Sequence, residues 1–246
     1  MTNFSEWKYF HKNDLTGYTL VIPSVAVGNV GQLACDLVIS SLRMTKLAMI
    51  YSPALIPVSG NDPYSPGSTA IASASELYIS ETKKLIILLL RAPLVHKYAK
   101  QFLLEVVEKL KAENVRDIVI LTSSYAHEKK HIMTSNFRYI ANEWCPYVQR
   151  LKKLDWAEHK SDNNRITILG GGFASLLYGI TIEKAVPCLV IYKYVSEGDN
   201  IPDATEMVQY MNKVLALFEE SDLNSKLIYP VSWSLLFGGP PPKHIY

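Results

Sequence analysis

Residues 18–51 read YTLVIPSVAVGNVGQLACDLVISSLRMTKLAMIY, and this stretch decides the fold class. The β-branched and aromatic residues of 18–22 end at Pro23, which is typical of a buried strand. Apolar residues then recur at helical spacing over 32–42, and residues 46–51 supply a second strand. The stretch therefore predicts a strand, a helix and another strand in succession, the unit from which sheets with covering helices are built.

The alternation of strands and helices continues along the rest of the chain. The patterns predict strands at 76–80, 84–91, 117–121, 165–169 and 188–195, and helices ending near Asn114, at 173–183 and beginning near Pro202. The six aliphatic residues of 85–90 indicate a central strand covered on both faces, and 81–83 suit the turn of a hairpin. We therefore expect an α/β fold with a single doubly wound, mainly parallel sheet and helices on both faces.

One domain accounts for nearly the whole chain. We expect this α/β domain to span residues 1–237 and a flexible C-terminal tail to span residues 238–246. Residues 123–164 are polar, aromatic and irregular, which predicts an insertion within the domain. Residues 53–69 hold many prolines and glycines and predict an exposed excursion.

The composition excludes several function classes. Lys and Arg number 25 against 23 Asp and Glu, a net charge of +2, which argues against general binding of nucleic acid. The longest apolar run, 85–90, is far shorter than the ~20 residues needed to cross a bilayer. Residues 1–13 contain no apolar signal region, so we expect a cytosolic protein, with nuclear entry open.

The cysteines give no sign of a metal or a disulfide framework. Cys35, Cys145 and Cys188 are isolated in the sequence and lie apart from any histidine cluster of ligand spacing. We expect no metal and no cofactor.

Two glycine-rich turns are candidates for phosphate binding. Gly28-Asn29-Val30-Gly31 and Gly170-Gly171-Gly172 each precede a predicted helix, where backbone N–H groups can face an anion. Neither has the spacing of a dinucleotide or P-loop motif. Glycine also serves tight strand-to-helix turns, and this structural role is the simpler interpretation.

Other polar residues are candidates for catalysis. Ser123 and Ser124 end a predicted strand near His127 and His131, but the nucleophile-elbow pattern is missing. The acids that flank Gly198, Glu197 and Asp199, suit either acid–base work or a turn before a helix. The sequence therefore predicts no catalytic site.

The C-terminal end of the chain has the features of an interaction segment. Trp233 and its apolar neighbours suit docking on the body of the protein, and Pro240-Pro241-Pro242 would form an extended spacer. The final Ile245-Tyr246 then suits insertion into a pocket of a partner, the alternative being a frayed end.

Four blocks of sequence are long and specific enough to identify a family. They are Val25-Ala26-Val27-Gly28-Asn29-Val30-Gly31-Gln32-Leu33-Ala34 with Asp36-Leu37, Gly60-Asn61-Asp62-Pro63-Tyr64, Val195-Ser196-Glu197-Gly198-Asp199-Asn200-Ile201-Pro202-Asp203-Ala204, and Ser232-Trp233-Ser234-Leu235-Leu236-Phe237-Gly238. Together these blocks resemble the proteasome assembly chaperone 2 family. Within these blocks, the residues expected to have mainly structural roles are Gly28, Asn29, Gly31, Glu197, Gly198, Asp199, Asn200 and Trp233.

The resemblance implies both a fold and a role. The fold would be similar to that of nucleoside phosphorylases but without their catalysis, and a phosphorylase-like enzyme that uses the two glycine turns is the alternative. The role would be that of a chaperone of the cytoplasm and nucleus that forms a heterodimer with proteasome assembly chaperone 1. Such heterodimers bind the alpha ring of the 20S proteasome near alpha-5 and alpha-7 and prevent off-pathway association.

The resemblance also implies a use for the tail. Family tails carry a hydrophobic residue, a tyrosine and then any residue, and they enter pockets between alpha subunits. In this chain His244, Ile245 and Tyr246 stand at that place. Ile245 and Tyr246 fill the first two positions, and Tyr246 carries the terminal carboxylate because the third position is missing.

Overall fold

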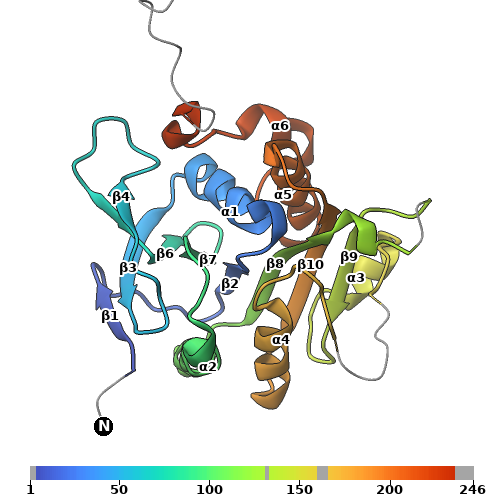
Figure 1. Ribbon diagram of the computed structural model, residues 1–246, viewed down its shortest axis with the longest axis horizontal. Helices are drawn as coiled ribbons and strands as arrows, with labels where there is room; N and C mark the ends of the chain where they lie inside the picture. The colour runs from blue at the N-terminus through green and yellow to red at the C-terminus, as the bar shows by residue number, and fades with distance from the viewer. Residues whose placement is uncertain (1–3, 131–132, 160–165, 236–246) are drawn as a thin grey trace, which may run out of the picture.

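An eight-stranded sheet forms the centre of the computed structural model, which describes residues 4–130, 133–159 and 166–235 (Figure 1). The strands of this sheet are β1 (Glu6–Tyr9), β2 (Thr19–Pro23), β3 (Thr45–Tyr51), β6 (Ser75–Ser80), β7 (Leu85–Leu90), β8 (Asp117–Tyr125), β9 (Phe137–Ala141) and β10 (Cys188–Val195). Their order is β1-β3-β6-β7-β2-β8-β10-β9. A separate two-stranded sheet pairs β4 (Ser59–Asn61) with β5 (Ile71–Ser73).

The centre of the large sheet is parallel and its flanks are antiparallel. Strand β2 pairs in parallel with β7 and β8, and β8 pairs in parallel with β10. The hairpin of β6 and β7, the outer strands β3 and β1, and β9 at the other edge all pair antiparallel. The α/β fold class is therefore confirmed, and the mixed sheet is parallel where the central strands are most deeply buried.

Helices cover both faces of the sheet. They are α1 (Val30–Ser41), α2 (His96–Ala112), α3 (Val148–Lys153), α4 (Ala174–Glu183), α5 (Ile201–Leu215) and α6 (Leu223–Lys226), with 3₁₀ turns η1 (Val27–Asn29), η2 (Ala126–Glu128), η3 (Glu220–Asp222) and η4 (Val231–Leu235). Helices α1 and α5 lie on one face, and α2 and α4 lie on the other (Figure 1). Within the described residues, no helix is long and apolar enough to span a bilayer.

The alternation of side chains along each strand builds two separate cores. Leu20 and Ile22 of β2 pack on the side of α2 and α4, whereas Val21 packs on the side of α1 and α5. In β8, Ile118 and Val119 separate in the same way. A continuous apolar strand is thus stable at this position because both of its faces are covered.

Two regions differ from the expectation. Residues 123–164 are less irregular than predicted, because β8 runs on to Tyr125 and the region also contains β9 and α3. The predicted strand at 165–169 is wrong over 166–169, which form a loop and a turn. The physical reason is that β9 pairs with the outer edge of β10, so residues 166–169 have no strand to pair with there. The predicted tail, 238–246, lies outside the described residues.

Candidate partner-binding surface

The first and third family blocks meet at the amino end of α1. Gly28 has a φ of +67°, and a Cβ placed on it would lie 2.6 Å from Oδ1 of Asn200. Asn29 follows with a left-handed φ of +51° and occupies the N-cap position of α1. A Cβ on Gly31 would lie 2.8 Å from the carbonyl oxygen of Leu121, so α1 packs closely against β8. The glycines of the first block are therefore required by close packing.

Asn200 joins the end of β10 to the start of α5. Its Nδ2 donates to the carbonyl of Ser196 and to Oδ2 of Asp203, both at 2.9 Å. Lys193, which is also buried, donates from Nζ to Oδ1 of Asp203 at 2.6 Å and lies 2.7 Å from Oε2 of Glu206. Oδ1 of Asn200 has no hydrogen-bond partner among the described residues. The amide and the ion pairs together fix the connection that carries the third block.

The remaining polar residues of the third block are exposed. Glu197, Gly198 and Asp199 all face solvent. Oδ1 of Asp199 accepts a hydrogen bond from the backbone N–H of Ile201 at 3.1 Å, in the first turn of α5. Glu197 and Asp199 therefore lie in a turn that leads into a helix, as the structural interpretation of this block expects.

The second family block is tied to α1 by a buried polar cluster. The hydroxyl of Tyr64 donates to Oδ1 of Asp36, which lies on α1. Nη2 of Arg91, at the end of β7, lies 3.3 Å from the same carboxylate oxygen and 3.2 Å from the Tyr64 hydroxyl oxygen. The neighbouring Glu76 accepts from Lys46 at 2.6 Å and from Tyr78 at 2.9 Å. Charges buried together in this way offset part of the cost of removing each from water.

Burial sets the protonation of this cluster. It raises the pKa of the Asp36 carboxyl above the ordinary value, although Arg91 and Tyr64 favour the charged form. Burial and the nearby Asp36 carboxylate raise the pKa of the Tyr64 hydroxyl well above its ordinary value. Tyr64 therefore keeps its proton at neutral pH and acts as the donor in its contact with Asp36.

Part of the fourth block lies beside the second. The backbone N–H of Ser232 donates to the carbonyl of Pro63 at 3.3 Å. Trp233 is half-buried against the core on the α1 side, and its ring stacks on that of Tyr229 with centroids 5.5 Å apart. The backbone N–H of Ile228 donates to Oγ of Ser41 at the end of α1. The last described segment is thereby fastened across α1.

The described parts of the four blocks, dispersed in the sequence, therefore form one belt around α1. Figure 1 shows α1, α5, the two-stranded sheet with β4, and the red C-terminal segment on the same side of the large sheet. Sequence reasoning included Asp36 in the first block but missed Lys193 and Arg91 as members of these buried contacts. Asp36 carried a signal, since a single carboxylate stands in an otherwise apolar stretch, 33–39. The tail residues His244, Ile245 and Tyr246 lie outside the described residues.

The two glycine turns pack against each other. The N–H of Val27 donates to the carbonyl of Gly170 at 3.0 Å, and Oγ of Ser24 donates to that of Gly171 at 2.8 Å. A Cβ on Gly172 would lie 2.1 Å from the carbonyl oxygen of Val25. The glycines thus serve close approach of two loops, which supports their structural role over phosphate binding.

The serines that are candidates for catalysis donate their hydroxyl hydrogens to backbone carbonyls. Ser123 Oγ donates to the carbonyl of Val27, and Ser124 Oγ donates to that of Leu169 at 2.8 Å. His127 stacks on Tyr125 with ring centroids 5.1 Å apart, and His131 lies outside the described residues. Cys35, Cys145 and Cys188 are free and buried. In the described part of the chain, no group of three or more His, Cys, Asp or Glu residues could hold a metal.

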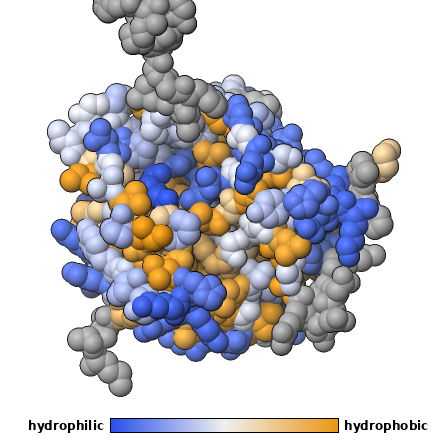
Figure 2. Space-filling view, in the orientation of Figure 1, coloured by the Kyte–Doolittle hydropathy of each residue, from blue (hydrophilic) through white to orange (hydrophobic). Residues whose placement is uncertain are grey.

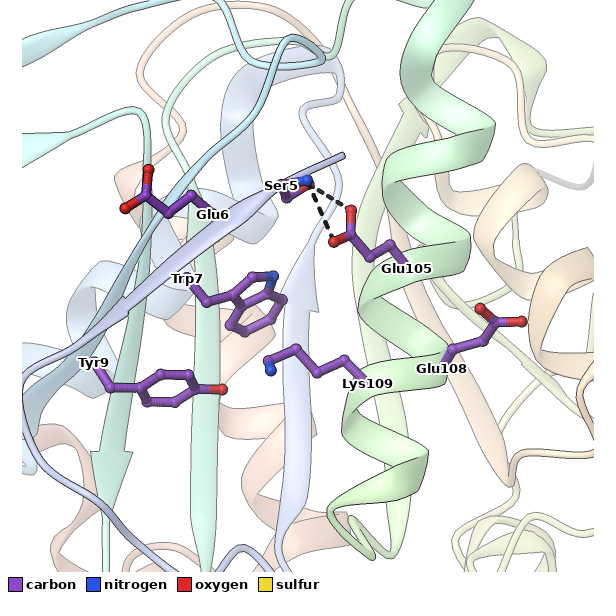
Figure 3. Close-up of a pocket in the computed structure, with 7 residues that line it drawn as sticks. All are labelled: Ser5, Glu6, Trp7, Tyr9, Glu105, Glu108 and Lys109. Carbon is purple, nitrogen blue, oxygen red and sulfur yellow. Dashed lines mark hydrogen bonds between the residues drawn. The ribbon is translucent and has the colours of Figure 1, made fainter. Parts of the chain in front are cut away.

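A cavity of about 700 Å³ lies on the other face of the sheet, between β1 and α2 (Figure 3). Ser5 donates from Oγ to Oε2 of Glu105 at 2.6 Å, and the Lys109 ammonium lies 5.2 Å from the centre of the Trp7 ring. The next strand residue on this side, Tyr9, donates to Glu113 at 3.2 Å. Two residues of a strand span nearly the same length as four residues of a helix, so these contacts repeat in register and fasten β1 to α2.

Comparisons with known proteins agree with this architecture. The model of the PAC2 family matches residues 20–226. Human proteasome assembly chaperone 2 is 35% identical over 93% of this chain and 95% of its own, and the yeast protein of that name, from Saccharomyces cerevisiae, is 25% identical over 89% and 94%. The solved structure of PbaA from Pyrococcus furiosus, described as an archaeal homologue of proteasome-assembly chaperone, superposes with a TM-score of 0.68 at 18% identity, covering 90% and 91% of the two chains.

The family match covers more than half of the chain, and the human relative covers nearly all of it. The first three blocks lie inside the matched range, and the fourth follows it. This chain belongs to the PAC2 family and is a homologue of proteasome assembly chaperone 2.

Proposed function

We propose that this protein is a non-catalytic chaperone of 20S proteasome assembly that works as a heterodimer with proteasome assembly chaperone 1. The observation that carries the proposal is its relationship to curated chaperones along nearly the whole chain. The hydrogen bonds that join the two glycine turns, and those made by Ser123 and Ser124, argue against an enzyme.

The client of the heterodimer would be the alpha ring, in the region of alpha-5 and alpha-7. The chaperone would promote formation of the ring and prevent off-pathway association, in the cytoplasm and nucleus where proteasomes assemble. Residues His244, Ile245 and Tyr246 would contact a pocket between alpha subunits. Trp233 supports this role because it anchors the chain shortly before the tail begins.

Co-expression tests the heterodimer. The full chain, produced together with a proteasome assembly chaperone 1 homologue, should elute as a single species with the mass of a one-to-one complex. A chain that stays monomeric beside that homologue, and that fails to retain alpha-ring precursors, would contradict the proposal. Phosphate-dependent release of a base from a panel of nucleosides would instead support an enzyme of the phosphorylase type.

Deletion of residues 243–246 tests the tail. The shortened heterodimer should bind alpha rings more weakly while keeping its thermal unfolding midpoint and its mass. The matched control is Lys243→Ala, which leaves Ile245 and Tyr246 in place. Equal affinity of the shortened and full-length proteins would show that the tail does not contribute to binding of the alpha ring and that the body of the protein makes the contacts.

A further inference from the structure

Residues 52–73 form an arm that projects from the sheet and is almost free of charge. The stretch 47–75, which includes the arm, contains one charged residue, Asp62, although 20% of the whole chain is charged. Other exposed segments of the chain carry lysine and acidic side chains, whose hydration opposes burial of the surface. The centres of protein interfaces are depleted of charge in the same manner, because a charge is costly to remove from water.

The arm is also apolar where it is exposed. Ile56, Val58 and Ile71 are 44%, 43% and 63% exposed. Figure 2 shows apolar side chains gathered at the left of the molecule, over the region where β3 and β4 lie in Figure 1. Exposed apolar residues on an uncharged projection indicate a segment that is covered in a complex.

The arm is held in place by contacts within the chain. Strands β4 and β5 pair from Ser59 with Ser73 to Asn61 with Ile71. Tyr64 ties the loop between these strands to Asp36 and Arg91, and Nζ of Lys46 donates to the carbonyl of Ile71 at 3.1 Å. An element that is already fixed loses little conformational entropy on binding.

The position of the arm indicates which partner it meets. Pro63, in the loop between β4 and β5, accepts the backbone hydrogen bond of Ser232, and the last described element, η4, therefore begins beside this loop of the arm. Figure 1 shows the arm and the C-terminal segment on the same side of α1. A partner that receives the residues after 235 is therefore within reach of the arm.

We propose that the 52–73 arm is a second docking element, which packs Ile56, Val58 and Ile71 against an uncharged, apolar patch on the same protein that receives the C-terminal tail. The proposal rests on the proposed function, under which that protein is an alpha subunit of the proteasome. An uncharged patch is the chemical match for the arm, because an unpaired charge facing these side chains would lose its hydration without compensation.

Charge introduced on the arm tests this. Ile71→Glu and Val58→Glu, each in the purified heterodimer, should weaken binding to alpha rings by about tenfold or more, measured as Kd by biolayer interferometry. The matched control is Leu154→Glu, a half-exposed apolar residue beside α3, which should bind as the wild type does. Ile71→Val should also retain wild-type affinity. Circular dichroism and the thermal midpoint establish that each variant is folded, and Val58→Glu carries the test if Ile71→Glu does not fold.

Each other outcome overturns the arm proposal in a recognisable way. If the wild-type heterodimer binds alpha rings and both arm variants bind equally well, the arm is not a docking element and the proposed function stands. If the arm variants lose the chaperone partner in a mass measurement, or break a complex of two copies of this chain, the arm belongs to that interface instead. If the wild-type heterodimer fails to bind any alpha subunit, the proposed function fails and the arm proposal fails with it.

Discussion

The hydroxyl of Tyr64 donates a hydrogen bond to the carboxylate of Asp36, and this contact joins a projecting arm to α1, around which the family blocks pack. The two residues are 28 positions apart and belong to different family blocks. Because both side chains are largely buried, removing one leaves the other without its partner in a poorly hydrated place.

Tyr64→Phe should lower the free energy of unfolding by about 1–3 kcal/mol, because Asp36 loses one of its two hydrogen-bond donors in a buried site. Denaturant unfolding followed by circular dichroism measures this loss, and hydrogen exchange should report faster opening at 52–73. The control Tyr229→Phe alters an exposed ring and should change the stability by less than about 0.5 kcal/mol. Equal stability of the two variants would mean that the Tyr64 contact does not hold the arm.

The charge of Asp36 should make stability depend on pH. Its pKa in the folded protein is raised above the unfolded value of about 3.9, so the folded state binds this proton more tightly. The stabilising contribution of this group is therefore full below about pH 3.9 and is lost as the pH rises through the folded-state pKa. The variant Asp36→Asn lacks this titration. On acidification from about pH 7 to about pH 4, the wild type should gain stability relative to Asp36→Asn, and a constant or reversed difference would contradict the assignment.

Gly28→Ala should destabilise the fold by about 1–3 kcal/mol, because the new Cβ meets Asn200 and the positive φ disfavours alanine. Thermal and denaturant unfolding measure the loss. Gly179→Ala is the matched control: it lies within α4 with open space around it, and it should stabilise the protein by about 0.5–1 kcal/mol. The opposite signs separate packing at Gly28 from a general effect of replacing glycine. If Gly28→Ala leaves the free energy of unfolding unchanged, the close contact between the first and third blocks is not needed for stability.

The three cysteines should resist alkylation in the folded protein. Burial raises the pKa of Cys145 to about 11 and that of Cys188 to about 12, and it raises the pKa of Cys35 well above the ordinary value. At about pH 7.5 the reactive thiolate is therefore scarce as well as inaccessible. Iodoacetamide followed by mass spectrometry should find little labelling of the native protein and three labels after unfolding in guanidinium. If Cys145 is alkylated as fast in the native protein as in the unfolded protein, the side chain is not buried.

The local sequence alone determined the central elements. The aliphatic run at 85–90, the strand at 188–195 and the helix that covers 173–183 follow from side-chain patterns within a few residues, and each lies within a residue of its predicted place. The two-faced burial of the central strands follows from the same patterns, because a strand without polar alternation is stable only between two layers.

Only the tertiary structure decided which distant residues meet. Strand β1 pairs with β3, about forty residues away, and β9 takes the edge of β10 that a strand at 165–169 would have needed. The contact of Gly28 with Asn200, and that of Tyr64 with Asp36, likewise depend on how helices and loops pack across the sheet. Local patterns indicate which face of an element is apolar. A buried polar group forms its hydrogen bonds with the partner that the packed fold brings to it, and that partner has no fixed spacing in the sequence.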